Sequence, residues 1–144
     1  MNALDYRPSA AIPLSALIVS AAAGLVNAGI ASAGRALGVD GSLPGIQPIA
    51  FLTLTIAAAL AGAVGWHLVN RGARRPGRVL RWLVPTFLAV SFIPDVLMGV
   101  SFGWPYAFTL ASMHVATIAI AVAVYWRLLP VTDRGRTPNK LPEK

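Results

Sequence analysis

Residues 82–126 read WLVPTFLAVSFIPDVLMGVSFGWPYAFTLASMHVATIAIAVAVYW, and Asp95 and His114 are the only Asp, Glu, Lys, Arg or His residues among them. A charged side chain at the centre of a bilayer costs on the order of 3 kcal/mol on insertion scales, so a residue kept there usually has a partner or a task. A helix needs about 20 predominantly apolar residues to cross the hydrocarbon core. The stretch therefore predicts two membrane-spanning helices, each containing one ionisable residue.

The rest of the chain has the same character. Of its 144 residues, 56% are hydrophobic and 12% are charged, whereas soluble domains typically carry about 25% charged residues. The mean hydropathy is +0.67. Two more uncharged runs, Pro8–Gly34 and Gly41–Trp66, are each long enough to span the bilayer. The predicted helices cover roughly 12–34, 47–69, 81–102 and 105–126.

Short connections with turn residues separate the predicted helices. They contain Gly38, Gly41, Pro44, Gly45 and Pro48 in the first, Gly72, Pro76 and Gly77 in the second, and Gly103, Trp104 and Pro105 in the third. Helices joined by short loops pack as antiparallel neighbours. We therefore expect one all-α membrane domain over 12–126, an antiparallel up-down four-helix bundle. It lies between a short cytoplasmic N-terminus, 1–11, and a disordered basic cytoplasmic tail, 127–144.

Basic residues indicate the orientation, because cytoplasmic loops carry an excess of Lys and Arg. On one side of the predicted bundle only Arg35 is basic, and the other side carries all the remaining basic residues. These are Arg7, Arg71, Arg74, Arg75, Arg78, Arg81, Arg127, Arg134, Arg136, Lys140 and Lys144. Both termini should therefore lie in the cytoplasm, with the protein in the cell membrane. Aromatic belts are expected at both interfaces: Trp66, Trp82 and Trp126 at the cytoplasmic one, Trp104 and Tyr106 at the outer one.

The first helix has an alternative interpretation as a signal peptide. Ala31-Ser32-Ala33 resembles a signal-peptidase site that follows an apolar run. The run is long for the apolar region of a signal peptide, which is about 7–15 residues. We therefore expect the helix to be retained, although cleavage would leave three helices.

The basic residues around the second connection also have two interpretations. The cluster consists of Arg71, Arg74, Arg75, Arg78 and Arg81. It is expected first of all to fix the topology, and a site for anionic lipid or a partner protein is the alternative. For the same reason, the net charge of +7 does not indicate a nucleic-acid partner.

Several classes of chemistry find no support in the sequence. The absence of cysteine excludes thiol redox chemistry, disulfides and cysteine metal sites. The chain lacks a glycine-rich phosphate loop, a nucleophile elbow and an HExxH motif. His67 is expected at the cytoplasmic end of the second helix, far in depth from His114, which argues against a two-histidine metal site. We therefore expect no cofactor and no metal, and the sequence favours a non-enzymatic role over an enzyme.

Depth along the helices groups the polar residues into one layer. At about 1.5 Å per residue, Asp95 and His114 lie roughly 10 and 14 Å below the outer boundary. Their helices are joined by a very short loop and must pack together, so the two side chains are expected to meet. Asn27 in the first helix and Thr53 or Thr55 in the second fall at a matching level.

This layer is the candidate site for a ligand or a proton. Its residues are Asp95, His114, Asn27, Thr53, Thr55 and Ser91. Pro94 is expected to kink the third helix beside Asp95, because proline removes one backbone hydrogen bond. The alternative is purely structural: interhelical hydrogen bonds that tie the bundle together, each contributing about 0.6 kcal/mol.

Short motifs at these residues resemble a known family. They are Ser91-Phe92-Ile93-Pro94-Asp95, Ser112-Met113-His114, and Leu129-Pro130 followed by the basic tail. Over roughly residues 10–130 the chain is similar to a family of small uncharacterised four-helix integral membrane proteins of actinobacteria. The resemblance implies a membrane domain of unknown function, with Asp95 and His114 at motif positions. It carries no assigned activity.

Three functions remain open from the sequence. The leading hypothesis is a non-enzymatic accessory or small-ligand-binding subunit. The second is a small proton-coupled transporter that works as an oligomer, although known four-helix multidrug exporters use a glutamate in their first helix, where this chain has Asn27. The third is a membrane enzyme that uses Asp95 and His114 as acid and base on a lipid-like substrate. The expected partners are the bilayer, an unidentified small molecule, and a second copy or another membrane protein.

Overall fold

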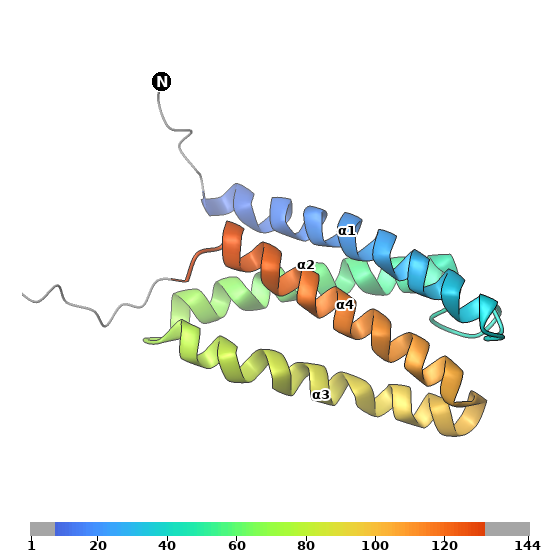
Figure 1. Cartoon of the computed structure of the whole chain (residues 1–144). Helices are drawn as coiled ribbons and strands as arrows, with labels where there is room; N and C mark the ends of the chain where they lie inside the picture. The colour runs from blue at the N-terminus through green and yellow to red at the C-terminus, as the bar shows by residue number, and fades with distance from the viewer. Residues whose placement is uncertain (1–7, 132–144) are drawn as a thin grey trace, which may run out of the picture.

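The computed structural model describes residues 8–131, which form four helices (Figure 1). They are α1 (Pro8–Ala36), α2 (Pro48–Gly72), α3 (Pro76–Phe102) and α4 (Trp104–Leu128). Each is long and apolar enough to cross a membrane. For these residues, the prediction of an all-α fold with four helices able to span a membrane is thus confirmed. The expectations for the N-terminal segment at 1–7 and for the tail at 132–144, with their basic residues, lie outside the described residues.

Two of the helices begin at prolines that the sequence predicted to lie outside helices. Pro8 and Pro76 are the first residues of α1 and α3, several residues before the predicted starts. Proline suits the first turn because its fixed φ is helical and the N–H it lacks would have no partner there. Pro76 and Gly77, expected in the second connection, accordingly lie inside α3. Further along, α3 continues as one helix through Pro94, and a kink there stays a prediction.

A single residue, Gly103, separates α3 from α4. Its φ of 100° lies in the region that favours glycine. One turn earlier, Gly99 marks the close approach of the two helices. A Cβ atom on Gly99 would lie 2.9 Å from the Cβ of Ala107. The tight turn and the missing side chain together hold α3 against α4 in this half of the bundle.

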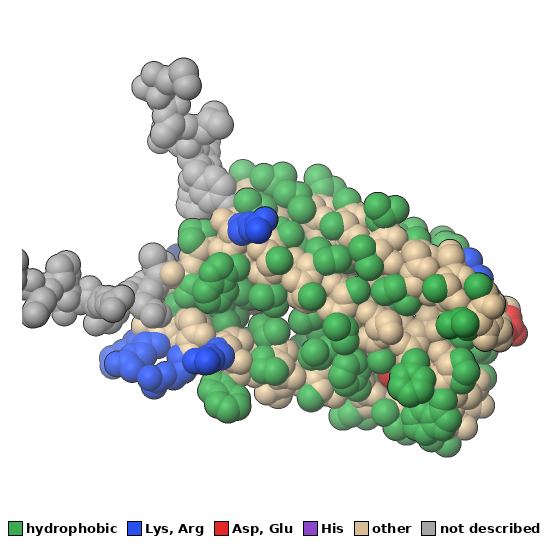
Figure 2. Space-filling model, in the orientation of Figure 1, with side chains coloured by type: hydrophobic (Ala, Val, Ile, Leu, Met, Phe, Trp, Pro, Cys, Tyr) green, Lys and Arg blue, Asp and Glu red, His purple; other side chains and the backbone are tan. Residues whose placement is uncertain are grey.

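Alanines and a few large side chains form the core, and many large apolar residues face outward. The first core cluster joins α1, α2, α3 and the end of α4: Ala11, Ala16, Val19, Ala23, Ala59, Ala63, Trp66, Leu80, Tyr125 and Leu129. The second joins the other ends of α1, α2 and α4: Ala31, Val39, Ile46, Phe51, Tyr106 and Met113. Exposed Leu, Ile, Val and Phe side chains cover the sides of the helices (Figure 2). Such exposed apolar side chains suit contact with lipid.

The four helices do not pack equally. α1 packs against both α2 and α4, whereas α3 packs mainly against α4 and has far less contact with α2 (Figure 1). α3 is also the helix with the smallest buried share. One flank of the bundle, between α2 and α3, is therefore loosely closed.

Two aromatic residues of the predicted interface belts have buried side chains. They are Trp66 and Tyr106, and their depth in the membrane stays a prediction. The indole Nε1–H of Trp66 donates to the carbonyl of Leu129 at 3.0 Å, and the hydroxyl of Tyr106 donates to the carbonyl of Pro44. Carbonyls at helix ends and in loops lack backbone partners, and these side chains supply donors. The other three tryptophans, Trp82, Trp104 and Trp126, are exposed.

Candidate functional site

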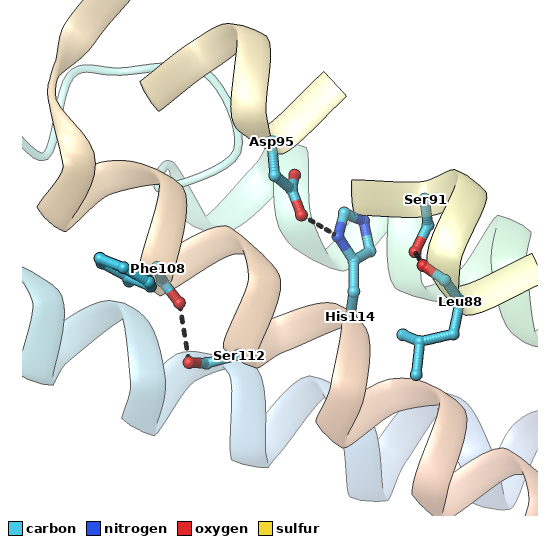
Figure 3. Close-up of polar contacts among 6 residues, drawn as sticks. All are labelled: Leu88, Ser91, Asp95, Phe108, Ser112 and His114. Carbon is cyan, nitrogen blue, oxygen red and sulfur yellow. Dashed lines mark hydrogen bonds and ion pairs between the residues drawn. The ribbon is translucent and has the colours of Figure 1, made fainter. Parts of the chain in front are cut away.

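Asp95 and His114 meet between α3 and α4 (Figure 3). The Nδ1 atom of His114 lies 2.7 Å from Oδ2 of Asp95, which is hydrogen-bond distance. Asp95 lies on the same face of α3 as Gly99, one turn away, so the close approach at Gly99 also brings its carboxylate to α4. The pairing of these two residues follows directly from the short α3–α4 turn.

The two partners have different environments. The side chain of Asp95 is 4% exposed, whereas that of His114 is 41% exposed. A carboxylate accepts hydrogen bonds, so Nδ1 of His114 donates when Asp95 is ionised. The bond fixes the orientation of the imidazole ring and leaves Nε2 free to exchange a proton or a hydrogen bond.

Nε2 has no hydrogen-bond partner among residues 8–131, since the bond to Asp95 is the one side-chain bond that His114 makes there. In neutral imidazole with Nδ1 protonated, Nε2 is an acceptor; in imidazolium it is a donor. Asp95 therefore fixes the ring of His114 and leaves its Nε2 atom available to another hydrogen-bond partner.

Asn27 forms a second polar group, in the interior of the bundle. Its Nδ2 atom donates to Oγ1 of Thr55 on α2 and to Oγ1 of Thr117 on α4, both at 3.0 Å. Asn27 is only 2% exposed, and its Oδ1 atom is buried without a hydrogen-bond partner among residues 8–131. Three helices are therefore linked through one side chain.

The predicted polar layer thus divides into two groups. Asp95 and His114 pair between α3 and α4, while Asn27 and Thr55 meet with Thr117 where α1, α2 and α4 come together. Thr117 was absent from the predicted site, although it lies one helical turn after His114. The spacing of three residues places Thr117 on the same face of α4 as His114 and could have indicated its part in the polar layer.

The remaining candidate residues bond within their own helices. The hydroxyl of Thr53 is exposed and donates to the carbonyl of Ile49, and the hydroxyl of Ser91 donates to the carbonyl of Leu88 (Figure 3). Such local bonds satisfy a hydroxyl without linking helices. Thr53 is therefore not part of either polar group. Ser91 is half-buried on the same face of α3 as Asp95.

Among the described residues, the Lys and Arg side chains lie at the two ends of the bundle (Figure 2). At one end the exposed arginines of the basic cluster surround the α2–α3 connection: Arg71, Arg74, Arg75, Arg78 and Arg81. At the other end Arg35 donates to the carbonyl of Ile46 at 2.8 Å. There the backbone N–H of Ser42 donates to Asp40, which holds the pKa of that carboxyl below its ordinary value.

The described residues contain no group of three His, Cys, Asp or Glu side chains placed to hold a metal ion. His67 lies near the end of α2, one turn before Arg71 and close to the basic cluster. The proposed signal-peptidase site, Ala31-Ser32-Ala33, lies inside α1, where Ala31 is buried.

Comparison with known proteins gives a family but no activity. No curated protein and no solved structure matches the chain. The model of a family of unknown function, DUF6069, matches residues 8–131, which include all four helices and both polar groups. This agrees with the resemblance to an uncharacterised family that the motifs indicated. The chain belongs to the DUF6069 family of unknown function.

Proposed function

We propose that this protein is a non-enzymatic multi-pass protein of the cell membrane that binds a proton or a small ligand at His114, with Asp95 as the positioning residue. The proposal rests on the difference in exposure between the side chains of Asp95 and His114. The carboxylate is buried and bonded, whereas the imidazole bonded to it is 41% exposed and has an available Nε2. A purely structural pair would be expected to bury both partners.

The chemistry of the pair supports reversible binding. Because Asp95 accepts from Nδ1, protonation and deprotonation of the ring take place at Nε2 without breaking the interhelical bond. A ligand that bonds to Nε2 meets a ring whose orientation is already set, so little conformational entropy is lost on binding. This division of roles corresponds to an accessory or ligand-binding subunit.

The proposed topology is an antiparallel up-down bundle with both termini in the cytoplasm. The arginine cluster at the α2–α3 connection supports it, because only Arg35 is basic at the opposite end of the described bundle. An actinobacterial cell membrane is the setting that the motif resemblance and the Ala, Gly, Arg and Pro content favour.

The proposal is tested with purified full-length protein by two readouts. A small molecule that co-purifies with wild type should be retained by His67→Gln and lost from His114→Gln. The thermal stability in lipid nanodiscs should depend on pH differently in wild type and in His114→Gln, and Asp95→Asn should change the same dependence. No bound molecule and an unchanged pH dependence in both variants would leave only the structural role.

Two other outcomes would point to the alternative functions. Proton-coupled uptake by liposomes that is abolished by Asp95→Asn would make the protein a transporter. Turnover of a lipid or prenyl substrate that is abolished by either substitution would make it an enzyme.

A further inference from the structure

The exposed ring of His114 lies on the side of α4 between its contacts with α1 and with α3. Thr117 accepts a hydrogen bond from Asn27 of α1, and Ala107 lies beside Gly99 of α3. At about 100° per residue around the helix, His114 falls between these two positions. The ring of His114 therefore faces the flank between α2 and α3, and only close contact between these two helices would cover the ring.

α2 and α3 close only loosely over this region. They share a short connection, but α3 has far less contact with α2 than with α4. Large apolar side chains are exposed on both helices, among them Ile56 and Leu60 on α2 and Phe87 and Val90 on α3. A surface of this kind is covered by hydrocarbon rather than by water.

The depth of His114 favours approach through this flank. Along α4, His114 is about 15 Å from Trp104 and about 21 Å from Leu128 at 1.5 Å per residue. Because the hydrocarbon core is about 30 Å thick, a molecule entering from either aqueous side would cross about half of it. A molecule already dissolved in the bilayer reaches the same depth directly.

The distribution of charge favours a ligand with an uncharged head. Among the described residues of α3 and α4, the basic side chains nearest to the pair along the chain are Arg81 and Arg127, about 20 Å away along their helices. An anionic head would find only His114, which is already bonded to Asp95. Burying such a charge without a further partner is unfavourable. A hydroxyl head can donate to Nε2 of the neutral ring. A hydroxyl or carbonyl head can accept from Nε2 of the protonated ring.

We infer that the ligand of His114 reaches it from the bilayer, between α2 and α3, and is an uncharged lipid-soluble molecule with one hydrogen-bonding head, as in long-chain alcohols and quinones. This inference rests on the proposed function and adds the route and the chemical class of the ligand. The apolar tail of the ligand lies along the exposed apolar flank, and its head bonds to Nε2.

The test uses full-length protein labelled with ¹⁵N-histidine in lipid nanodiscs. The chain has two histidines, so His67 is an internal control. The probes are dodecanol, dodecane, which lacks the head, and dodecanoate, which carries a charged head. Dodecanol should shift the ring signals of His114 and leave those of His67 unchanged, and dodecane should shift neither. His114→Gln should bind dodecanol about five- to tenfold more weakly than wild type, and His67→Gln should bind it equally well.

The route is tested with two paramagnetic agents. A nitroxide on the middle of a lipid chain should broaden the His114 signals more than a water-soluble gadolinium chelate does, with the reverse order for His67. Stronger broadening of His114 by the chelate, or a larger shift with dodecanoate than with dodecanol, would overturn the inference but leave the proposed function standing. The proposed function fails separately if His114 responds to no probe and its protonation does not change with pH.

Discussion

Asp95 and His114 share one hydrogen bond of 2.7 Å but differ in exposure, with side chains 4% and 41% exposed. The buried partner is on α3, which is held mainly by α4, and the exposed partner is on α4. The bond therefore fastens the least buried helix to the rest of the bundle and at the same time orients the ring. Both roles lead to measurable expectations.

The pair should be energetically coupled. In a double-mutant cycle with Asp95→Asn and His114→Gln, we expect a coupling energy of about 1.5–3 kcal/mol, as for a hydrogen bond that involves a charged group. The measurement is the free energy of unfolding in mixed micelles with increasing denaturing detergent. Additive effects of the two substitutions would show that the bond contributes nothing to stability.

The Asn27 group should stabilise the bundle, and two threonines on α2 provide a matched comparison. Thr55→Val removes an acceptor of Asn27 and should cost about 0.6 kcal/mol, the average for interhelical bonds in membranes. Thr53→Val makes the same chemical change at an exposed position bonded within its own helix and should have almost no effect. Equal losses for the two variants in the unfolding assay would contradict the assignment of Thr55 to this group.

The close approach at Gly99 should be sensitive to a single methyl group. Gly99→Ala places a Cβ atom 2.9 Å from that of Ala107, so α3 must move away from α4. The expected cost is about 1–3 kcal/mol, as for overpacked cores. Gly65→Ala on α2 is the control, because a Cβ there meets nothing within 4 Å, and the change should be neutral or stabilising. Two variants of equal stability would show that α3 does not need this contact.

The topology is directly measurable because the chain has no native cysteine. Ser42→Cys, between α1 and α2, should react with an impermeant maleimide added to intact cells. Arg74→Cys, between α2 and α3, should react only after the membrane is permeabilised. Both positions are exposed. The opposite labelling pattern would invert the proposed orientation.

The four helices were predictable because apolar length alone determines which segments span a bilayer. The meeting of Asp95 and His114 was also predictable, since one very short turn forces their helices together. Hydropathy does not distinguish a lipid-facing surface from a helix-facing one, because lipid tails are as apolar as leucine. Neither the weak contact between α2 and α3 nor the resulting exposure of His114 could therefore be predicted from the sequence.

Other details also escape the sequence for local reasons. The sequence places Pro8 in the N-terminal segment and Pro76 in a connection because proline usually interrupts helices, whereas here each begins one. Residue type favours an interface for Trp66 but does not indicate that its side chain donates to the carbonyl of Leu129 inside the bundle. Its role depends on a residue 63 positions away in the chain, which no local pattern indicates.

In the proposed function, Asp95 holds the ring of His114 so that Nε2 is the exchanging atom. The most direct measurement is the ¹⁵N spectrum of the His114 ring in nanodiscs as a function of pH, for wild type and Asp95→Asn. We predict that in wild type Nδ1 stays protonated while Nε2 changes its protonation, and that Asp95→Asn removes this preference for Nδ1 without altering His67. The same ring spectrum in both proteins, or a proton exchanging at Nδ1 in wild type, would contradict the account.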